Sequence, residues 1–227
     1  MGWIGWVGAG LGAAGLVLLA VAPAAPRGQS VETGPTDAQT RVLWIGNSHT
    51  HRHDLPGRVA AMLAAAGHPT FILARTANDM RLQDHLSEDW PAAALPGPWD
   101  VMILQAHSVG AQVDPGGFLR ALDRILALKA LPSRVLLYQN WAYRRGRADF
   151  YRANPDETPA SVQDEIDALF GYLPSRYAVE VIPTGRALHE AALGGQPVIH
   201  PDGNHLTPDG AQLAAEMIAA ALLAPSQ

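Results

Sequence analysis

The sequence predicts an α/β fold of three layers, an α/β/α sandwich in which helices cover both faces of a five-stranded parallel sheet. From residue 41 onward, short apolar runs alternate with segments whose apolar residues recur at helical spacing. The short runs are apolar at nearly every position, which is typical of parallel strands that are buried on both faces. In such a fold the working site lies at the carboxyl ends of the strands.

Five short runs are the predicted strands, and six longer segments are the predicted helices. The strands are residues 41–46, 70–73, 100–105, 134–139 and 178–182. The helices are residues 55–66, 80–87, 115–131, 160–173, 184–193 and 208–223. Residues 141–159 are polar, rich in arginine and interrupted by prolines, which predicts a long loop.

The first 40 residues differ in composition from the rest of the chain. Residues 3–22 are almost all apolar or glycine, and prolines follow at 23 and 26. Small residues at Ala20 and Ala22 fit a signal-peptidase site, so residues 1–26 are predicted as a signal peptide. The run is also long enough, at about 20 residues, to cross a bilayer, so a retained N-terminal anchor is an equal alternative. Both alternatives predict an exported protein, with a linker over residues 27–40 and one domain over 41–227.

Charge and cysteine content exclude several classes of function. The net charge is −5 with 16 Lys+Arg, which argues against a nucleic-acid partner held through its phosphates. The chain has no cysteine, which excludes disulfides, thiolate nucleophiles and cysteine-ligated metal sites. Hydrophobic residues make up 48% of the chain, so a full core can form.

Two polar segments lie where the fold places functional loops. The first, Ile-Gly-Asn-Ser-His-Thr at 45–50, follows the first strand directly. The second, at 200–210, precedes the last helix and carries Asp202 three residues before His205. A serine hydroxyl needs a neighbouring base, and that base needs an acceptor that fixes its tautomer. The alternative for each segment is an ordinary turn in which Asn, Ser and Asp cap helices.

Together these segments resemble two sequence blocks of the SGNH hydrolase superfamily, the GDSL-like esterases and lipases. Gly46-Asn47-Ser48 is similar to the first block, with Asn in place of the commoner Asp, and Asp202-x-x-His205-Leu-Thr-Pro-x-Gly is similar to the last. The resemblance covers residues 41–223 and implies a flavodoxin-like sheet. It implies that Ser48 is the nucleophile, that His205 is the general base and then the acid, and that Asp202 orients His205.

The resemblance also implies an oxyanion hole, and here the sequence departs from the family pattern. The backbone N–H of Ser48 is the first implied donor. The usual glycine after the second strand is missing from residues 75–79, so the N–H of Asn78 is the expected second donor. The usual Gly-x-Asn-Asp after the third strand is replaced by Leu-Gln-Ala-His-Ser at 104–108, so the carboxamide of Gln105 is the expected third donor. A bacterial branch of the superfamily has a similar Gly-Asn-Ser start and a similar Leu-Gln.

Further residues are candidates for contact with a substrate. Asn47 and His107 are predicted to bind it, and Trp141 to stack on a sugar ring, with packing under the long loop as the alternative for Trp141. The arginines at 144, 145 and 147 are either an anion site or solvated charges.

Three closely spaced histidines suggest a metal site as an alternative. His49, His51 and His53 alternate along the chain, so in an extended segment they would share one face and could form a metal site. No carboxylate cluster of clear spacing accompanies them, which favours a site without metal. His200 is a second candidate base, but the spacing of His205 matches the last block of the family.

The resemblance therefore implies an exported serine hydrolase that forms an acyl-Ser48 intermediate and needs no metal or organic cofactor. The implied substrate is a small-molecule ester, with an acylated carbohydrate as one class. An acyltransferase with the same triad is one alternative. The altered second and third blocks favour another, a non-catalytic carbohydrate-binding module on the same scaffold.

Overall fold

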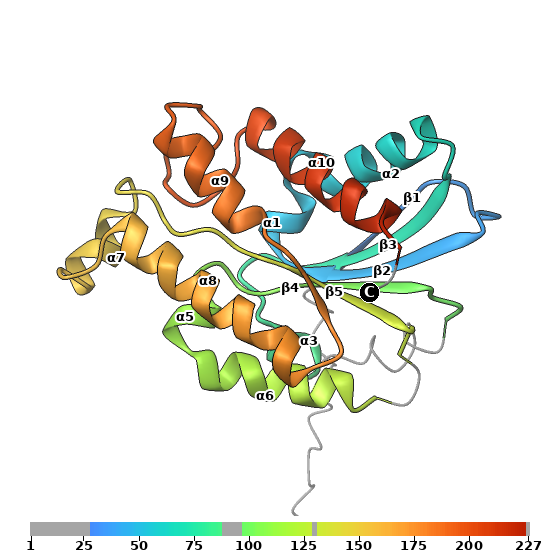
Figure 1. Cartoon of the computed structure of the whole chain (residues 1–227), viewed down its shortest axis with the longest axis horizontal. Coiled ribbons are helices and arrows are strands. Elements are labelled where there is room, and N and C mark those ends of the chain that lie inside the picture. The colour runs from blue at the N-terminus through green and yellow to red at the C-terminus, as the bar shows by residue number, and fades with distance from the viewer. Residues whose placement is uncertain (1–27, 88–96, 129–130, 226–227) are drawn as a thin grey trace, which may run out of the picture.

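A computed structural model describes residues 28–87, 97–128 and 131–225, and Figure 1 shows their arrangement. Six strands form one sheet in the order β1-β3-β2-β4-β5-β6. Five of them run parallel: β2 (Thr40–Gly46), β3 (Thr70–Thr76), β4 (Val101–Gln105), β5 (Arg134–Tyr138) and β6 (Glu180–Ile182). Helices on both faces complete three layers, so the predicted α/β/α sandwich is confirmed.

The sixth strand corrects the expectation of five strands and of a linker throughout residues 27–40. Strand β1 (Gln29–Thr33) pairs antiparallel with β3 at the edge of the sheet, where Gln29 lies opposite Thr76. Its side chains are mostly polar and none is buried, so the hydrophobic pattern could not reveal it. The free edge of β3 offers unpaired backbone groups, and these are sufficient to bind a polar strand.

Helices cover the two faces of the sheet as separate layers (Figure 1). One face carries α2 (Leu55–Ala65), α9 (Thr184–Leu193) and α10 (Pro208–Leu223). The other carries α3 (Leu82–His85), α5 (Gly110–Val113), α6 (Pro115–Leu126) and α8 (Pro159–Arg176). Four short helical elements are absent from the sequence prediction: α1 (Ser48–His51), a 3-10 turn (Arg52–Asp54), α5, and α7 (Ala148–Ala153), which lies in the predicted long loop.

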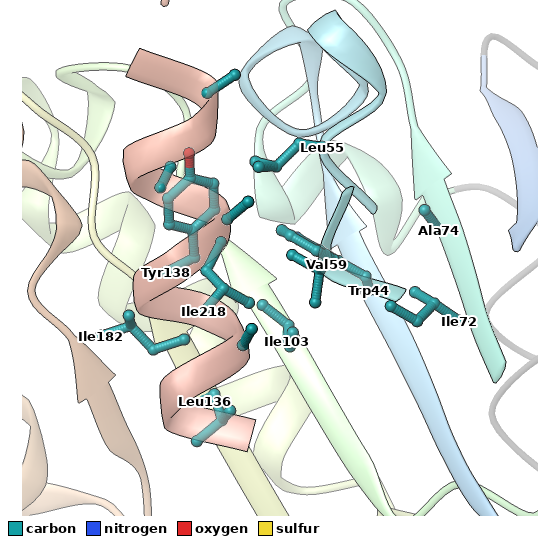
Figure 2. Close-up of a cluster of buried hydrophobic side chains, with 14 of the residues drawn as sticks. Trp44, Leu55, Val59, Ile72, Ala74, Ile103, Leu136, Tyr138, Ile182 and Ile218 are labelled. Atoms are coloured by element: carbon teal, nitrogen blue, oxygen red, sulfur yellow. The ribbon is translucent and has the colours of Figure 1, made fainter. Parts of the chain in front are cut away.

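The central strands alternate their side chains between two hydrophobic cores. Trp44 of β2 packs under α2 and α10, whereas Leu43 and Ile45 face α6 and α8. Figure 2 shows the first core, in which Tyr138 of β5 and Ile218 of α10 also lie. The rings of Trp44 and Tyr138 meet edge to face, with centroids 5.9 Å apart. Two filled cores hold the strands firmly, so the loops at their carboxyl ends start from a rigid base.

Residues 1–26, predicted as a signal peptide or membrane anchor, lie outside the described residues. Within residues 28–87, 97–128 and 131–225, no helix combines the length and the apolar character that crossing a bilayer requires. Export and the role of the N-terminal segment therefore stay predictions.

Candidate active site

The structure brings together the three residues implied as a triad. Ser48 begins α1 directly after β2, and His205 lies in the loop before α10. The Ser48 Oγ lies 3.2 Å from His205 Nε2, and His205 Nδ1 lies 2.8 Å from Asp202 Oδ2. Hydroxyl, imidazole and carboxylate thus follow one another in the order that an activated serine nucleophile needs.

The turn that carries Asp202 keeps its carboxylate ionised. The Asp202 Oδ1 accepts the backbone N–H groups of Asn204 and His205, each at 2.9 Å. Burial alone would raise the pKa of Asp202, but these two N–H donors and the His205 ring together outweigh burial. The pKa of the Asp202 carboxyl therefore lies well below its usual range. An ionised Asp202 places the proton on His205 Nδ1 and leaves Nε2 as the acceptor for the Ser48 hydroxyl.

The loop that carries Ser48 has room only for glycine at position 46. A Cβ on Gly46 would lie 2.7 Å from Gln105 Oε1 and closer still to the Thr50 hydroxyl. The His85 Nε2–H of α3 donates to the Gly46 carbonyl at 2.9 Å. Two polar side chains therefore pack against the bare Cα, which explains the glycine by close approach and not by an unusual backbone angle.

Gln105 supports the loop that carries Ser48. Its Oε1 accepts the backbone N–H of Asn47 and the hydroxyl of Thr50, both at 2.9 Å. Because the Asn47 N–H can only donate, the amide oxygen must face this loop, and the amide nitrogen donates to the Ala106 carbonyl. The role expected for Gln105 as third oxyanion donor stays a prediction. In that role, the second hydrogen on Nε2 would donate to the oxyanion.

The Asn47 side chain joins the loop that carries Ser48 to the loop that follows β3. Its Oδ1 accepts the His49 N–H and so caps α1, and its Nδ2 donates to the Met80 carbonyl at 3.2 Å. Both polar groups of this buried side chain are engaged within the protein, which leaves little for the substrate contact expected of Asn47. Asn78, the expected second oxyanion donor, is exposed in the joined loop, next to Asp79 with φ of 55°.

Two backbone N–H groups in these joined loops are free to donate. Within the described part of the chain, nothing accepts the N–H of Ser48 or the N–H of Asn78. An oxyanion hole needs free N–H donors of this kind, because they can bind the negative oxygen of a tetrahedral intermediate.

A buried cluster next to the triad consists of His49, Asn140, Trp141 and Asn204. The His49 Nε2–H donates to Asn204 Oδ1 at 2.9 Å, and its Nδ1 accepts from Asn140 Nδ2 at 3.1 Å. The His49 ring stacks on Trp141 with centroids 4.4 Å apart. The Trp141 Nε1–H donates to the Asn204 carbonyl at 2.7 Å. The cluster therefore links the loops after β2 and β5 to the loop before α10.

The buried cluster is uncharged, and two of its residues are sequence neighbours of the triad residues. Burial lowers the pKa of His49 to about 3, against the opposing effect of its hydrogen bond with Asn204. His49 follows Ser48 directly, and Asn204 lies between Asp202 and His205. These two neighbourhoods are visible in the sequence and could have indicated the cluster, but only the fold shows that the two side chains meet.

Three further predicted residues, Trp141, His107 and His200, make no hydrogen bond with the Ser48 hydroxyl within the described residues. Trp141 is only 1% exposed, so the structure favours the packing alternative over stacking on a sugar. His107 is half-buried and lines a small pocket between α3 and α5. His200 is exposed, and its Nδ1 accepts the Asp202 N–H at 3.2 Å, but the Ser48 hydroxyl is hydrogen-bonded to His205 instead.

The three alternating histidines do not share one face, because α1 and the 3-10 turn replace the extended segment that this would need. His49 lies in the buried cluster, and the His53 Nε2–H donates to the Leu206 carbonyl at 3.0 Å. Across residues 28–87, 97–128 and 131–225, no three His, Cys, Asp or Glu side chains are grouped closely enough to hold a metal ion.

Comparison with known proteins agrees with this fold. No family model and no curated protein matches the sequence. Among solved structures, a protein described as an SGNH hydrolase from Slackia heliotrinireducens is 22% identical, with a TM-score of 0.70 over 81% of this chain and 98% of that one. A member of the lipolytic G-D-S-L family from Veillonella parvula is 18% identical, with a TM-score of 0.59 over 80% and 97% of the two chains.

An acetylxylan esterase from Geobacillus stearothermophilus is also similar, at 14% identity and a TM-score of 0.56 over 83% of this chain and 96% of that one. At such identities the similarity establishes the fold and not the activity. The chain has the fold of the SGNH hydrolases, as the resemblance in its sequence implies.

Proposed function

We propose that this protein is a serine hydrolase that cleaves esters through a covalent acyl-Ser48 intermediate. The observation that carries the proposal is the chain of hydrogen bonds from the Ser48 hydroxyl through His205 to Asp202, at 3.2 Å and 2.8 Å. A serine far from a base is a weak nucleophile. This geometry therefore favours a catalytic role for the two segments over the alternative of ordinary helix-capping turns.

In the proposed reaction, the Ser48 Oγ attacks the ester carbonyl while His205 Nε2 takes the hydroxyl proton. The resulting imidazolium is stabilised by the ionised Asp202, which already accepts the Nδ1 proton. His205 then gives its proton to the leaving alcohol as the carbon–oxygen bond of the ester breaks. A water molecule, activated by the same nitrogen, releases the acid and restores Ser48.

The negative oxygen of the tetrahedral intermediate would bind the free N–H of Ser48, with Asn78 N–H as second donor. Gln105 acts on this hole through the loop that it supports, because its amide oxygen holds the N–H of the residue before Ser48. Each donor of this kind is worth about 3–4 kcal/mol of transition-state stabilisation.

We propose a small acyl ester as the substrate, with an acetylated carbohydrate as the first class to test. One structure with this fold is named as an acetylxylan esterase, which supports this class of substrate. The alternatives are acyl transfer to an alcohol on the same triad and carbohydrate binding without catalysis.

The test combines a fluorophosphonate probe with hydrolysis of p-nitrophenyl acetate. We expect the wild type to be labelled and active, and Ser48→Ala to be unlabelled, with its rate lowered by about 10⁴-fold or more. Ser175→Ala removes a hydroxyl from the exposed end of α8 and serves as a matched control with unchanged activity. Equal rates for Ser48→Ala and the wild type would contradict the proposal, and retained glycan binding without labelling would favour the binding module.

A further inference from the structure

A pocket of about 470 Å³ lies beside the loop that carries Asp202 and His205. Residues 144–146, the start of α8 and the second half of α9 line it. The Arg144 N–H donates to the Gly203 carbonyl at 2.8 Å. A Cβ on Gly146 would lie only 2.6 Å from the Pro201 carbonyl, so the 144–146 segment packs directly on the turn. One wall of the pocket is therefore attached to the turn that holds the triad acid and base.

The pocket is basic, although the whole chain carries a net charge of −5. Arg144 and Arg145 both line it, and within the described residues neither guanidinium has a carboxylate or hydrogen-bond partner. The acidic side chains Asp164 and Asp167 of α8 are paired with Arg186 instead. Two guanidinium groups without counter-charges at one concavity attract an anion, and each can donate two parallel hydrogen bonds to it.

A buried histidine lines the same pocket. His189 of α9 is 4% exposed, and neither ring nitrogen has a hydrogen-bond partner in the part of the chain that the structure describes. Burial and the charges of Arg186 and Arg144 lower the pKa of His189, so its ring is neutral and carries one N–H donor. Within the described residues no acceptor is bonded to the N–H of this ring, so the N–H is available to a ligand oxygen in the pocket.

The N-terminus of α8, an 18-residue helix, lies at another wall of the pocket. Thr158 caps this helix, and Pro159 and Ala160 begin its first turn, whose backbone dipoles favour a nearby negative charge. Leu193 adds an apolar surface that is 68% exposed. The pocket is thus lined by positive charge, by one neutral N–H donor and by an apolar side chain.

We propose that this pocket binds a monosaccharide-sized ligand through its anionic group, a carboxylate or a phosphate, with Arg144, Arg145 and His189 as the groups that contact it. The volume of about 470 Å³ is larger than a simple oxyanion needs, and it suits a ring that packs on Leu193. The site contains neither Ser48 nor His205 and does not depend on the proposed esterase activity.

Calorimetric titration of the full chain with glucuronate, glucose 6-phosphate and glucose tests the proposal directly. We expect at least one of the two anions to bind with a millimolar Kd or tighter, and glucose to bind at least tenfold more weakly. Binding should weaken as salt rises from 50 to 500 mM, because screening reduces the attraction of exposed charges. The tighter of the two anions identifies whether a carboxylate or a phosphate is the preferred group.

Variants assign the binding to this pocket. Arg144→Gln and Arg145→Gln should each raise the Kd about tenfold, and His189→Asn about threefold. Arg124→Gln removes the same charge from an exposed position on α6, a helix that does not line the pocket, and should leave the Kd unchanged.

Three outcomes would overturn the proposal: no binding of either anion, equal binding of glucose, or the same loss in Arg124→Gln as in Arg144→Gln. Ser48→Ala should bind the anion as the wild type does. A failure of the esterase proposal and a failure of this one are therefore distinguishable, because each has its own measurement.

Discussion

Two histidines beside Ser48 have opposite environments, although their ring centroids are only 5.5 Å apart. His205 is half-buried, with an ionised carboxylate at Nδ1 and a hydroxyl at Nε2. His49 is buried, with a side-chain amide at each ring nitrogen. Proximity to a serine therefore does not by itself make a histidine a base, because the partner and the exposure of the ring decide whether it can take a proton.

The two environments differ in how well they stabilise a protonated, positively charged ring. The imidazolium of His205 would face Asp202, and opposite charge favours it. The imidazolium of His49 would be buried between amides, and the loss of hydration lowers its pKa to about 3. We infer that His205 moves protons, whereas His49 is a positioning residue that holds the loop with Asn204.

The largest effect is expected from His205→Ala. This change removes the proton acceptor of Ser48, so kcat for p-nitrophenyl acetate should fall by about 10⁴-fold or more with little change in KM. His68→Ala, at an exposed histidine before β3, is the matched control and should keep most of the activity. A comparable loss in both variants would show that the loss is not specific to His205.

A loss of about 10³–10⁴-fold in kcat is expected from Asp202→Asn. The neutral amide cannot stabilise the imidazolium, and it offers its own N–H to His205 and so favours the wrong tautomer. Asp209→Asn, in the first turn of α10, removes the same charge nearby and should change kcat less than threefold. Activity of Asp202→Asn close to that of wild type would show that the carboxylate does not assist His205.

A smaller loss, about 10–100-fold in kcat, is expected from His49→Ala. The side chain touches neither the Ser48 hydroxyl nor the carboxylate, so the loss would come from a shift of the Asp202–His205 turn. His49→Gln can still donate an N–H to Asn204 and should recover part of the activity. The pH dependence of kcat should stay unchanged in both variants, because His49 does not titrate in the working range. A displaced pH profile would identify His49 as a proton carrier and contradict its positioning role.

The smallest effect is a change in how stability depends on pH. The pKa of His49 is about 3 and that of His85 is about 4, both lowered chiefly by burial from 6.5. Below pH 6.5 the unfolded chain binds protons that the folded chain excludes, so stability is complete above that pH. It falls as the pH drops toward the folded values, by up to about 1.4 kcal/mol per pH unit for each histidine.

Urea unfolding of the wild type, His49→Gln and His85→Gln at pH 7, 6 and 5 measures this effect. Each variant should have a shallower fall between pH 7 and 5 than the wild type, whereas His68→Gln should follow the wild type because His68 is exposed. Parallel curves for all four proteins would mean that His49 and His85 are protonated in the folded state.

The sequence predicts the fold well where burial imposes a pattern. Runs that are apolar on both faces mark the parallel strands, and α9 and α10 begin and end at the predicted residues. Strand β1 could not be predicted this way, since its polar residues are held by the backbone of β3 and not by a core. Helices α1 and α7 are too short for helical periodicity to appear.

The candidate site is predictable to the extent that its residues follow strands or precede helices. The sequence places Ser48 and His205 at the same edge of the sheet, and the structure brings them within hydrogen-bonding distance. It does not show which way a buried amide or indole faces. Position after a strand predicts a role in substrate chemistry for Gln105 and Trp141, whereas in the structure both support loops through contacts that depend on three-dimensional packing.

The turn from Asp202 to His205 forms its acid–base pair entirely within four residues, through two backbone N–H groups and one ring nitrogen. The acid and the base must therefore move together, and any displacement of the turn changes mainly the separation between His205 and Ser48. The Arg144 N–H is bonded to the Gly203 carbonyl in the middle of this turn, so the distance between Ser48 and His205 depends on contacts from outside these four residues.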